Sequence, residues 1–186
     1  MSIQMPLKRN GFYLLFFIVS LGFSSLGYSV ESSENEINEL QQRRLKNARL
    51  ALMVPDGDWR IALTVYTQDM EYREPALTIK NLDKMEDFLK QMFTHTPDYS
   101  LVIEDETLVN GMYSATWTMQ GTWQGDKIKY KVPGMSVIKF REGESLIYYQ
   151  RDYFSEGEIW SKIPYIGVFA RGLRNKYKRD LNYKEN

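Results

Sequence analysis

The feature that constrains the fold of this chain most is a row of four strand-like segments. Each segment is followed by a turn signal or by the next element. They cover residues 99–109, 112–124, 127–140 and 146–154, and they are rich in β-branched and aromatic residues. The turns between them carry Asn-Gly at 110–111, Gly-Asp at 125–126 and Glu-Gly at 142–143. Asn-Gly is the strongest short hairpin signal, and strands joined by short turns pair antiparallel. The pattern therefore predicts a four-stranded antiparallel meander.

The part of the chain before this meander is predicted to be mostly helical. Residues 36–53 carry apolar side chains near helical spacing. Asp58 can cap a short helix, and Asn81 can cap a longer one whose apolar residues recur at i, i+3 and i+4. A strand over residues 66–74 lies between these two helices. This order predicts an α+β fold, with helices on one face of a curved sheet.

Residues 1–29 have the features of a secretory signal peptide. Lys8 and Arg9 precede an apolar run at residues 12–21, and small residues at 27–29 predict cleavage after Ser29. The mature protein is then expected to be secreted or periplasmic. The alternative is an uncleaved anchor, which would be the chain's one contact with a membrane. The apolar stretch is slightly short for a bilayer span of about 20 residues, which favours cleavage.

The remaining chain divides into three expected parts. Residues 30–55 form an N-terminal helix, residues 56–163 the main domain, and residues 164–186 a basic C-terminal extension. Residues 169–179 have the spacing of an amphipathic helix. Acidic residues are mixed in downstream, so a solvated tail is the favoured interpretation over a membrane-binding helix.

Composition excludes several classes of function. The chain has 24 Lys and Arg residues and 24 Asp and Glu residues, so its basic and acidic charges balance. No polyanionic partner such as a nucleic acid is therefore expected. The absence of cysteine excludes a disulfide scaffold, a thiolate zinc site and a cysteine nucleophile. One histidine, His95, cannot build a usual zinc site, so neither a metal nor a cofactor is predicted. The high aromatic content, 14%, favours a sheet-rich core or an aromatic pocket.

The last strand carries the candidate catalytic residue. Side chains alternate across a strand, so two faces can be assigned from the sequence. One face is expected to carry Leu146, Tyr148, Gln150, Asp152 and Phe154. The other is expected to carry Ile147, Tyr149, Arg151 and Tyr153. A carboxylate among aromatic and aliphatic groups is either desolvated and reactive or simply held by hydrogen bonds.

The order of elements, together with three segments, resembles the nuclear transport factor 2-like superfamily, in its SnoaL-like branch. Residues 66–75 are similar to that family's strand that ends in a polar residue and Pro. Residues 134–143 are similar to the family's strand that precedes a turn made of an acidic residue and Gly. Residues 150–154 are similar to the Trp-Arg-Asp-Tyr-Phe-Asp motif of limonene-1,2-epoxide hydrolase-like proteins. The resemblance covers about residues 56–163. It implies a sheet curled into a cone, with N-terminal helices closing the pocket.

The resemblance also implies functional residues. Asp152 matches a pocket Asp that serves as acid and base, and Tyr72 matches a pocket Tyr of the epoxide hydrolases. Glu74 stands where those enzymes have Asn. Trp117 and Met119 stand where they carry the Arg and Asp of a water-activating relay, which speaks against epoxide hydrolysis by that mechanism.

Together these observations predict a catalytic group and a substrate pocket. Desolvation and a second carboxylate would raise the pKa of an Asp, which suits proton abstraction next to a carbonyl or acid-catalysed ring closure. Asp152 would be general base and acid, Tyr72 would donate a hydrogen bond to a substrate oxygen, and Glu74 would assist. The residues expected to bind substrate are Trp117, Met119, Tyr148, Gln150 and Phe154.

The predicted function is that of an exported protein whose aromatic pocket around Asp152 binds a small, mostly apolar molecule. Isomerisation, cyclisation or hydration would fit such a pocket. The alternative is a non-catalytic ligand-binding or homodimerisation module. Its dimer surface would be the strand face with Ile147, Tyr149 and Tyr153, together with Val137. A homodimer is expected under either hypothesis, so dimerisation does not separate them.

Overall fold

A computed structural model describes residues 35–54, 57–125, 127–162 and 166–180 of the chain. The predicted signal peptide, residues 1–29, lies outside the described residues. The chain separates into two compact units, residues 1–39 and 40–186, and the fold below is that of the second. No helix in the described part of the chain is long and apolar enough to cross a membrane.

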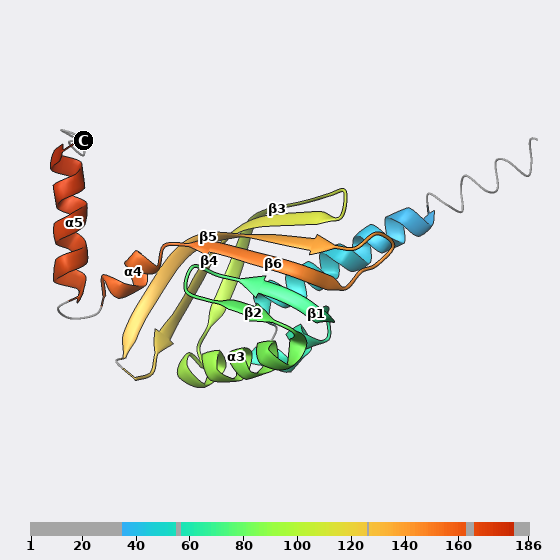
Figure 1. Cartoon of the computed structure of the whole chain (residues 1–186), viewed down its shortest axis with the longest axis horizontal. Helices are drawn as coiled ribbons and strands as arrows, with labels where there is room; N and C mark the ends of the chain where they lie inside the picture. Colours follow the sequence, from blue (N-terminus) through green and yellow to red (C-terminus); the bar gives the residue numbers. More distant parts are fainter. Residues whose placement is uncertain (1–34, 55–56, 126, 163–165, 181–186) are drawn as a thin grey trace, which may run out of the picture. The chain divides into compact units, whose positions relative to one another are not determined.

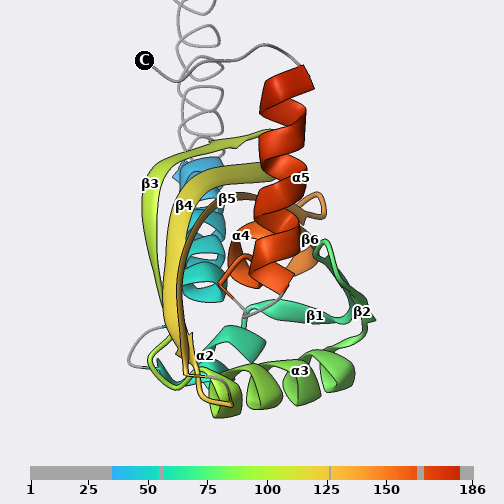
Figure 2. The same ribbon diagram turned by 90° about the vertical axis from the view of Figure 1, so that its left-hand side faces the viewer.

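Six strands form one curled sheet that does not close on itself. They are β1 (Tyr66–Arg73), β2 (Thr78–Lys80), β3 (Ser100–Val109), β4 (Met112–Trp123), β5 (Ile128–Phe140) and β6 (Ile147–Phe154). Their order across the sheet is β2-β1-β6-β5-β4-β3, and β4 and β5 bend strongly along their length (Figures 1 and 2). Strands β3 to β6 are the predicted meander. The predicted α+β fold with a strongly curved, mostly antiparallel sheet is confirmed.

Local turn chemistry explains how the meander begins. Asn110 and Gly111 both have positive φ, at 50° and 72°, which is the backbone of a two-residue hairpin turn whose twist matches that of the strands. Val109 and Met112 pair directly across this turn. The Asn-Gly signal in the sequence is therefore confirmed.

One pairing joins distant parts of the sequence and is parallel. Strand β1 lies beside β6, so that Tyr72 pairs with Gln150 and Arg73 with Arg151. In sequence, strand β2 and helix α3 (Leu82–His95) lie between β1 and the meander. The sequence pattern predicted both strands but not this pairing, which brings the candidate site residues together.

Helix ends are set by side-chain caps. The N-terminal helix covers residues 35–53, and α2 (Trp59–Leu63) follows it. Asp58 caps α2 by accepting a hydrogen bond from the backbone N–H of Arg60 at 3.2 Å. Asn81 caps α3 in the same way, by accepting a hydrogen bond from the backbone N–H of Lys84 at 3.1 Å. Both predicted caps are confirmed.

From Leu40 onwards, the N-terminal helix is fastened to the turn between β5 and β6. The buried guanidinium of Arg44 donates to the backbone oxygens of Glu144, at 2.8 Å, and Arg141, at 2.7 Å. It also lies over the ring of Phe140. Ala48, on the same side of the helix, is fully buried in the core. The helix therefore lies against the concave side of the sheet (Figure 2).

Strand β6 contains a β-bulge that changes which side chains face inward. Lys139 pairs with Tyr149, but Phe140 pairs with Ile147, so Tyr148 is an extra residue. The strict alternation expected from the sequence therefore fails at this end of the strand. Ile147 is fully buried, instead of lying on the outer face. Tyr148 lies beneath the guanidinium of Arg141, at 5.1 Å.

Two helices follow the sheet in the described part of the chain. Strand β6 is followed by α4 (Glu156–Trp160) and then α5 (Ile166–Asp180). Helix α5 contains the residues for which the sequence indicated an amphipathic helix, and it is a continuous helix.

Gly134 on β5 makes room for a large ring in the core. It pairs with Trp117 on β4, and a Cβ added at Gly134 would lie 2.3 Å from the indole ring. The indole therefore lies directly over this glycine, where no other residue leaves space.

We expect Gly134→Ala to lower the free energy of unfolding by about 1–3 kcal/mol, because the added methyl group must displace the buried indole. Urea denaturation measures this. The control is Gly125→Ala, where the nearest atom to a new Cβ is 3.5 Å away and a change within about 0.5 kcal/mol is expected. Equal effects of the two substitutions would show that the indole does not occupy this position.

Candidate functional site

A cavity of about 420 Å³ is bounded by the sheet, α3 and α4. Its lining is mostly aromatic and aliphatic, and it includes three carboxyl groups, Glu74, Asp152 and Glu156. No Lys or Arg is among the described residues that line it. Helix α4 contributes Ile159, so the cavity is enclosed by an element that follows the sheet as well as by α3.

The structure brings most of the predicted site residues to this cavity. Those that line it are Tyr72, Glu74, Trp117, Met119, Asp152 and Phe154. Gln150 lines a smaller cavity of about 40 Å³, which shares Tyr72 and Asp152 with the larger one. Tyr148 is not among the described residues that line either cavity, because the bulge turns it toward Arg141.

The Tyr72 hydroxyl lies between the carboxyl groups of Glu74 and Asp152. It is 3.0 Å from Oδ2 of Asp152 and 3.2 Å from Oε2 of Glu74. A phenol has one hydrogen to donate, so it can donate to only one of them. Both contacts are hydrogen bonds only if one of the two carboxyls carries a proton. The geometry therefore fits a pair of carboxyls that share one proton through Tyr72.

Asp152 receives further hydrogen bonds from two side chains whose orientation is fixed. Its Oδ1 accepts from Ser136 at 2.6 Å and from the amide nitrogen of Gln150 at 3.0 Å. The indole N–H of Trp117 donates to the Ser136 oxygen at 2.8 Å, which directs the serine hydrogen to Asp152. Tyr66 donates to the amide oxygen of Gln150 at 2.6 Å, which turns its nitrogen toward Asp152. Trp117 and Gln150, predicted as substrate contacts, thus also hold Asp152 in place.

Glu74 is held differently, because it lies in the turn between β1 and β2. Its backbone N–H donates to the carbonyl oxygen of Leu77 at 3.0 Å, and Pro75 follows it. Its side chain is partly buried and faces the cavity. Apart from Tyr72, no described side chain donates a hydrogen bond to its carboxyl group.

Burial shifts the pKa of both carboxyls upward. Burial raises the pKa of Glu74 to about 7, with the Tyr72 hydrogen bond acting against this rise and the charge of Asp152 adding to it. Burial also raises the pKa of Asp152, and the hydrogen bonds from Ser136, Gln150 and Tyr72 oppose that rise. Glu74 therefore changes its protonation near neutral pH, where a general acid or base is most effective.

Tyr99 is a site residue that the sequence analysis missed. It lines both cavities, and its ring packs edge-on against Phe93 at 5.5 Å. Burial raises the pKa of Tyr99, and the charges of Asp152 and Glu74 act in the same direction, so its hydroxyl stays protonated. No hydrogen bond to another described side chain fixes that hydroxyl. The sequence showed it only as the first residue of a strand, and no motif marked it.

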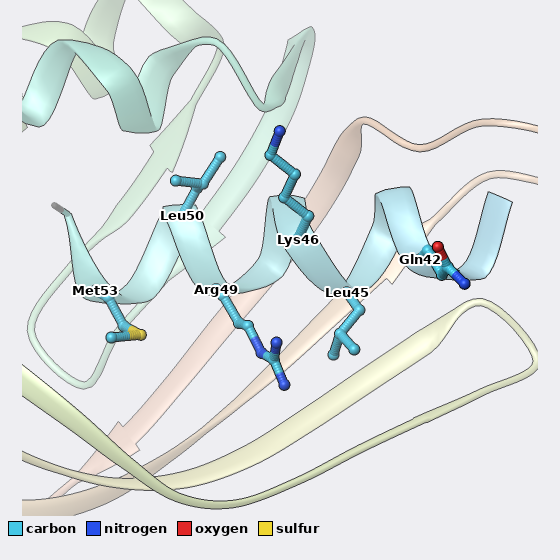
Figure 3. Close-up of a pocket in the computed structure, with 6 residues that line it drawn as sticks. All are labelled: Gln42, Leu45, Lys46, Arg49, Leu50 and Met53. Carbon is cyan, nitrogen blue, oxygen red and sulfur yellow. The ribbon is translucent and has the colours of Figure 1, made fainter. Parts of the chain in front are cut away.

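A second hollow, of about 370 Å³, follows one face of the N-terminal helix. Its described lining residues all come from this helix (Figure 3): Gln42, Leu45, Lys46, Arg49, Leu50 and Met53. The set contains no carboxyl, hydroxyl or aromatic group, and Arg49 is paired with Glu106 on β3. In addition, no three acidic or histidine side chains in the described ranges are placed to hold a metal ion. The acid/base groups are therefore concentrated in the first cavity.

The raised pKa of Glu74 predicts a pH-dependent stability. Between about pH 4.5 and 7 the folded state binds more protons than the unfolded state, so stability falls as pH rises through this range. We expect a fall of about 1–3 kcal/mol in the wild type, which Glu74→Gln removes. Urea denaturation at a series of pH values measures it. Glu86→Gln, an exposed position on α3, is the control and should keep the fall; a fall that persists in Glu74→Gln would assign it to another group.

Comparisons with known proteins agree with this fold. Residues 49–147 match the family model of the SnoaL-like domain, and no curated protein matches the sequence. Among solved structures, a phenazine biosynthesis-related protein from Pseudomonas aeruginosa matches with a TM-score of 0.60 at 13% identity, covering 69% of this chain and 89% of that one. A proposed SnoaL-like polyketide cyclase from Jannaschia sp. CCS1 matches with a TM-score of 0.58 at 13% identity, covering 68% and 94%.

A third structure is that of a protein with a ketosteroid isomerase-like fold from Catenulispora acidiphila, in complex with trimethylamine. It matches with a TM-score of 0.55 at 13% identity and covers 64% of this chain and 90% of that one. At such identities these structures show a common fold. The matched family segment contains Tyr72, Glu74, Trp117 and Met119, and Asp152 follows it by five residues. Because this segment spans more than half of the chain, the chain belongs to the SnoaL-like domain family, which has the nuclear transport factor 2-like fold.

Proposed function

We propose that this protein binds a small, mostly apolar molecule in the larger cavity and transfers a proton on it, using Asp152, Tyr72 and Glu74 as one acid/base unit. The observation that carries this proposal is the position of the Tyr72 hydroxyl, within hydrogen-bonding distance of both carboxyls. A structural role for Tyr72 would need only one acceptor. Burying a second carboxyl beside it costs free energy, which a purely structural network avoids.

The unit can hold its proton at either end. With the proton on Glu74, that carboxyl donates to the Tyr72 oxygen, and Tyr72 donates to ionised Asp152. With the proton on Asp152, both hydrogen bonds reverse and Glu74 is ionised. The two carboxyls then titrate as a pair rather than singly. Because Glu74 has fewer hydrogen-bond donors, it is the end that exchanges a proton with a ligand.

The chemistry that follows is proton transfer next to a carbonyl group. Ionised Glu74 takes a proton from the carbon beside the carbonyl, and the electron pair of that C–H bond forms the enolate. The Tyr99 hydroxyl donates a hydrogen bond to the enolate oxygen, the role that the sequence analysis gave to Tyr72. In a β,γ-unsaturated ketone the charge of the enolate extends to the γ carbon, and Glu74 isomerises the molecule by returning the proton there, which moves the C=C bond into conjugation with the carbonyl. If the enolate carbon attacks a second carbonyl in the same molecule, a ring closes and Glu74 protonates the new alkoxide.

The lining indicates which ligands fit. Three carboxyl groups, with no Lys or Arg among the described lining residues, disfavour carboxylate or phosphate ligands. A volume of about 420 Å³ is in the usual range for small-molecule sites. A neutral, largely apolar carbonyl compound meets both conditions. One of the similar structures is a proposed polyketide cyclase, which is in keeping with ring closure by this chemistry.

We expect the wild type to accelerate hydrogen–deuterium exchange at the carbon beside the carbonyl of cyclic ketones such as 2-tetralone in heavy water, followed by NMR. Loss of the acid/base group in Glu74→Gln or Asp152→Asn should lower that rate by about 10²–10⁴-fold. Tyr99→Phe should lower it through loss of the hydrogen bond to the enolate. Glu86→Gln is the matched control, and circular dichroism checks the fold of each variant. Wild-type exchange rates in both carboxyl variants would contradict the proposal.

A non-catalytic homodimerisation module is the second candidate, and one surface favours it. Val102, Met135 and Tyr153 are exposed on the sheet face that is turned away from the cavity, with exposed fractions of 61%, 38% and 43%. Met135 pairs directly with Tyr153 on the neighbouring strand. Exposed aromatic and Met side chains are typical of protein interfaces. Ile147, which the sequence analysis placed on this surface, is buried in the core.

If this face forms a dimer, Met135→Glu should convert the dimer to a monomer, because a carboxylate would be buried at its centre. Sedimentation velocity measures the change. Lys129→Glu, at the far end of the same strand and on the same face, changes charge in the same direction and should leave the dimer intact. A wild-type protein that sediments as a monomer would exclude this second candidate.

A further inference from the structure

Helix α5 exposes an apolar stripe. Phe169, Leu173 and Tyr177 are 69%, 54% and 67% exposed. They follow one another at intervals of four residues, which places them on one side of the helix. Asn175 lies roughly on the opposite side, because each residue turns the helix by about 100°. Three large apolar side chains in a row on one helix face are unusual for a surface that contacts only water.

The same helix is strongly basic. Its basic residues are Arg171, Arg174, Lys176, Lys178 and Arg179, against a single acidic residue, Asp180. This helix therefore carries four more basic than acidic residues, in a chain whose formal net charge is zero. Lys176 pairs with Asp180, and Arg171 donates to the backbone oxygen of Ser161 at 3.1 Å. Positive charge is thus concentrated on a helix that also exposes an apolar stripe.

We propose that α5 lies on the surface of an anionic lipid bilayer, with Phe169, Leu173 and Tyr177 inserted at the level of the head groups. An apolar stripe flanked by Lys and Arg is the arrangement by which helices bind in the plane of a membrane interface. The expectation of a solvated tail was based on acidic residues downstream, but within the helix only Asp180 is acidic. The occupant is a bilayer rather than a second copy, because pairing two such helices would bring their positive charges together.

The absence of cysteine from the chain allows a direct test. The full chain with Leu173→Cys is labelled with the environment-sensitive dye NBD, and Asn175→Cys on the opposite side is labelled as the matched control. Each is mixed with vesicles of phosphatidylcholine alone, or of phosphatidylcholine and phosphatidylglycerol at a ratio of about 7:3. We expect the emission at position 173 to increase and shift to the blue with the anionic vesicles, and that at position 175 to change little. Vesicle binding through the hydrophobic N-terminal segment would not produce this difference between two positions of one helix.

Charge is tested in the same assay. Removing two cations with Arg174→Gln and Arg179→Gln should weaken the response at position 173 by on the order of tenfold or more, and about 0.5 M salt should weaken it too. Any of three results would overturn the proposal: no response at position 173, an equal response at positions 173 and 175, or a full response with phosphatidylcholine alone.

Discussion

The parallel pairing of β1 with β6 is the constraint on which the site depends. It places Tyr72 beside Gln150, so that the phenol reaches Asp152 two residues further along β6. Without this pairing, the strand that ends near Glu74 and the last strand of the meander would have no common edge. The proposed acid/base unit therefore depends on a contact between segments about 80 residues apart, as the separation of Tyr72 and Asp152 shows.

The direction of the hydrogen bond from Ser136 to Asp152 follows from one group that can only donate. The Trp117 indole N–H has no acceptor capacity, so it fixes the Ser136 hydroxyl, which in turn points its hydrogen at the carboxyl. The indole can occupy this position because Gly134 leaves the space above β5 empty. The absence of a side chain at Gly134 thus determines the orientation of the Ser136 hydroxyl proton, two residues further along the same strand.

The sequence predicted local features well and non-local ones poorly. Turn and cap residues such as Asn110 and Asn81 act through their own backbone neighbours, so their effects were readable from the chain. The bulge at Tyr148 depends on how β6 pairs with β5, and a one-residue slip moves a side chain to the other face. Tyr99 was missed for a similar reason. Its importance comes from a hydroxyl with no hydrogen-bond partner among its described neighbours, and a sequence pattern does not record that.

The two carboxyls differ in what the fold requires of them. Asp152 lies in the middle of the sheet and accepts hydrogen bonds from three side chains, so a replacement there would leave Ser136, Gln150 and Tyr72 without their acceptor. Glu74 lies in a turn that is closed by backbone groups, and its side chain supports none of the sheet pairing. Evolution can therefore vary position 74 at little cost to stability. Divergence in the chemistry of this fold is expected to arise first at the turn after β1, while the charge at the end of β6 is retained.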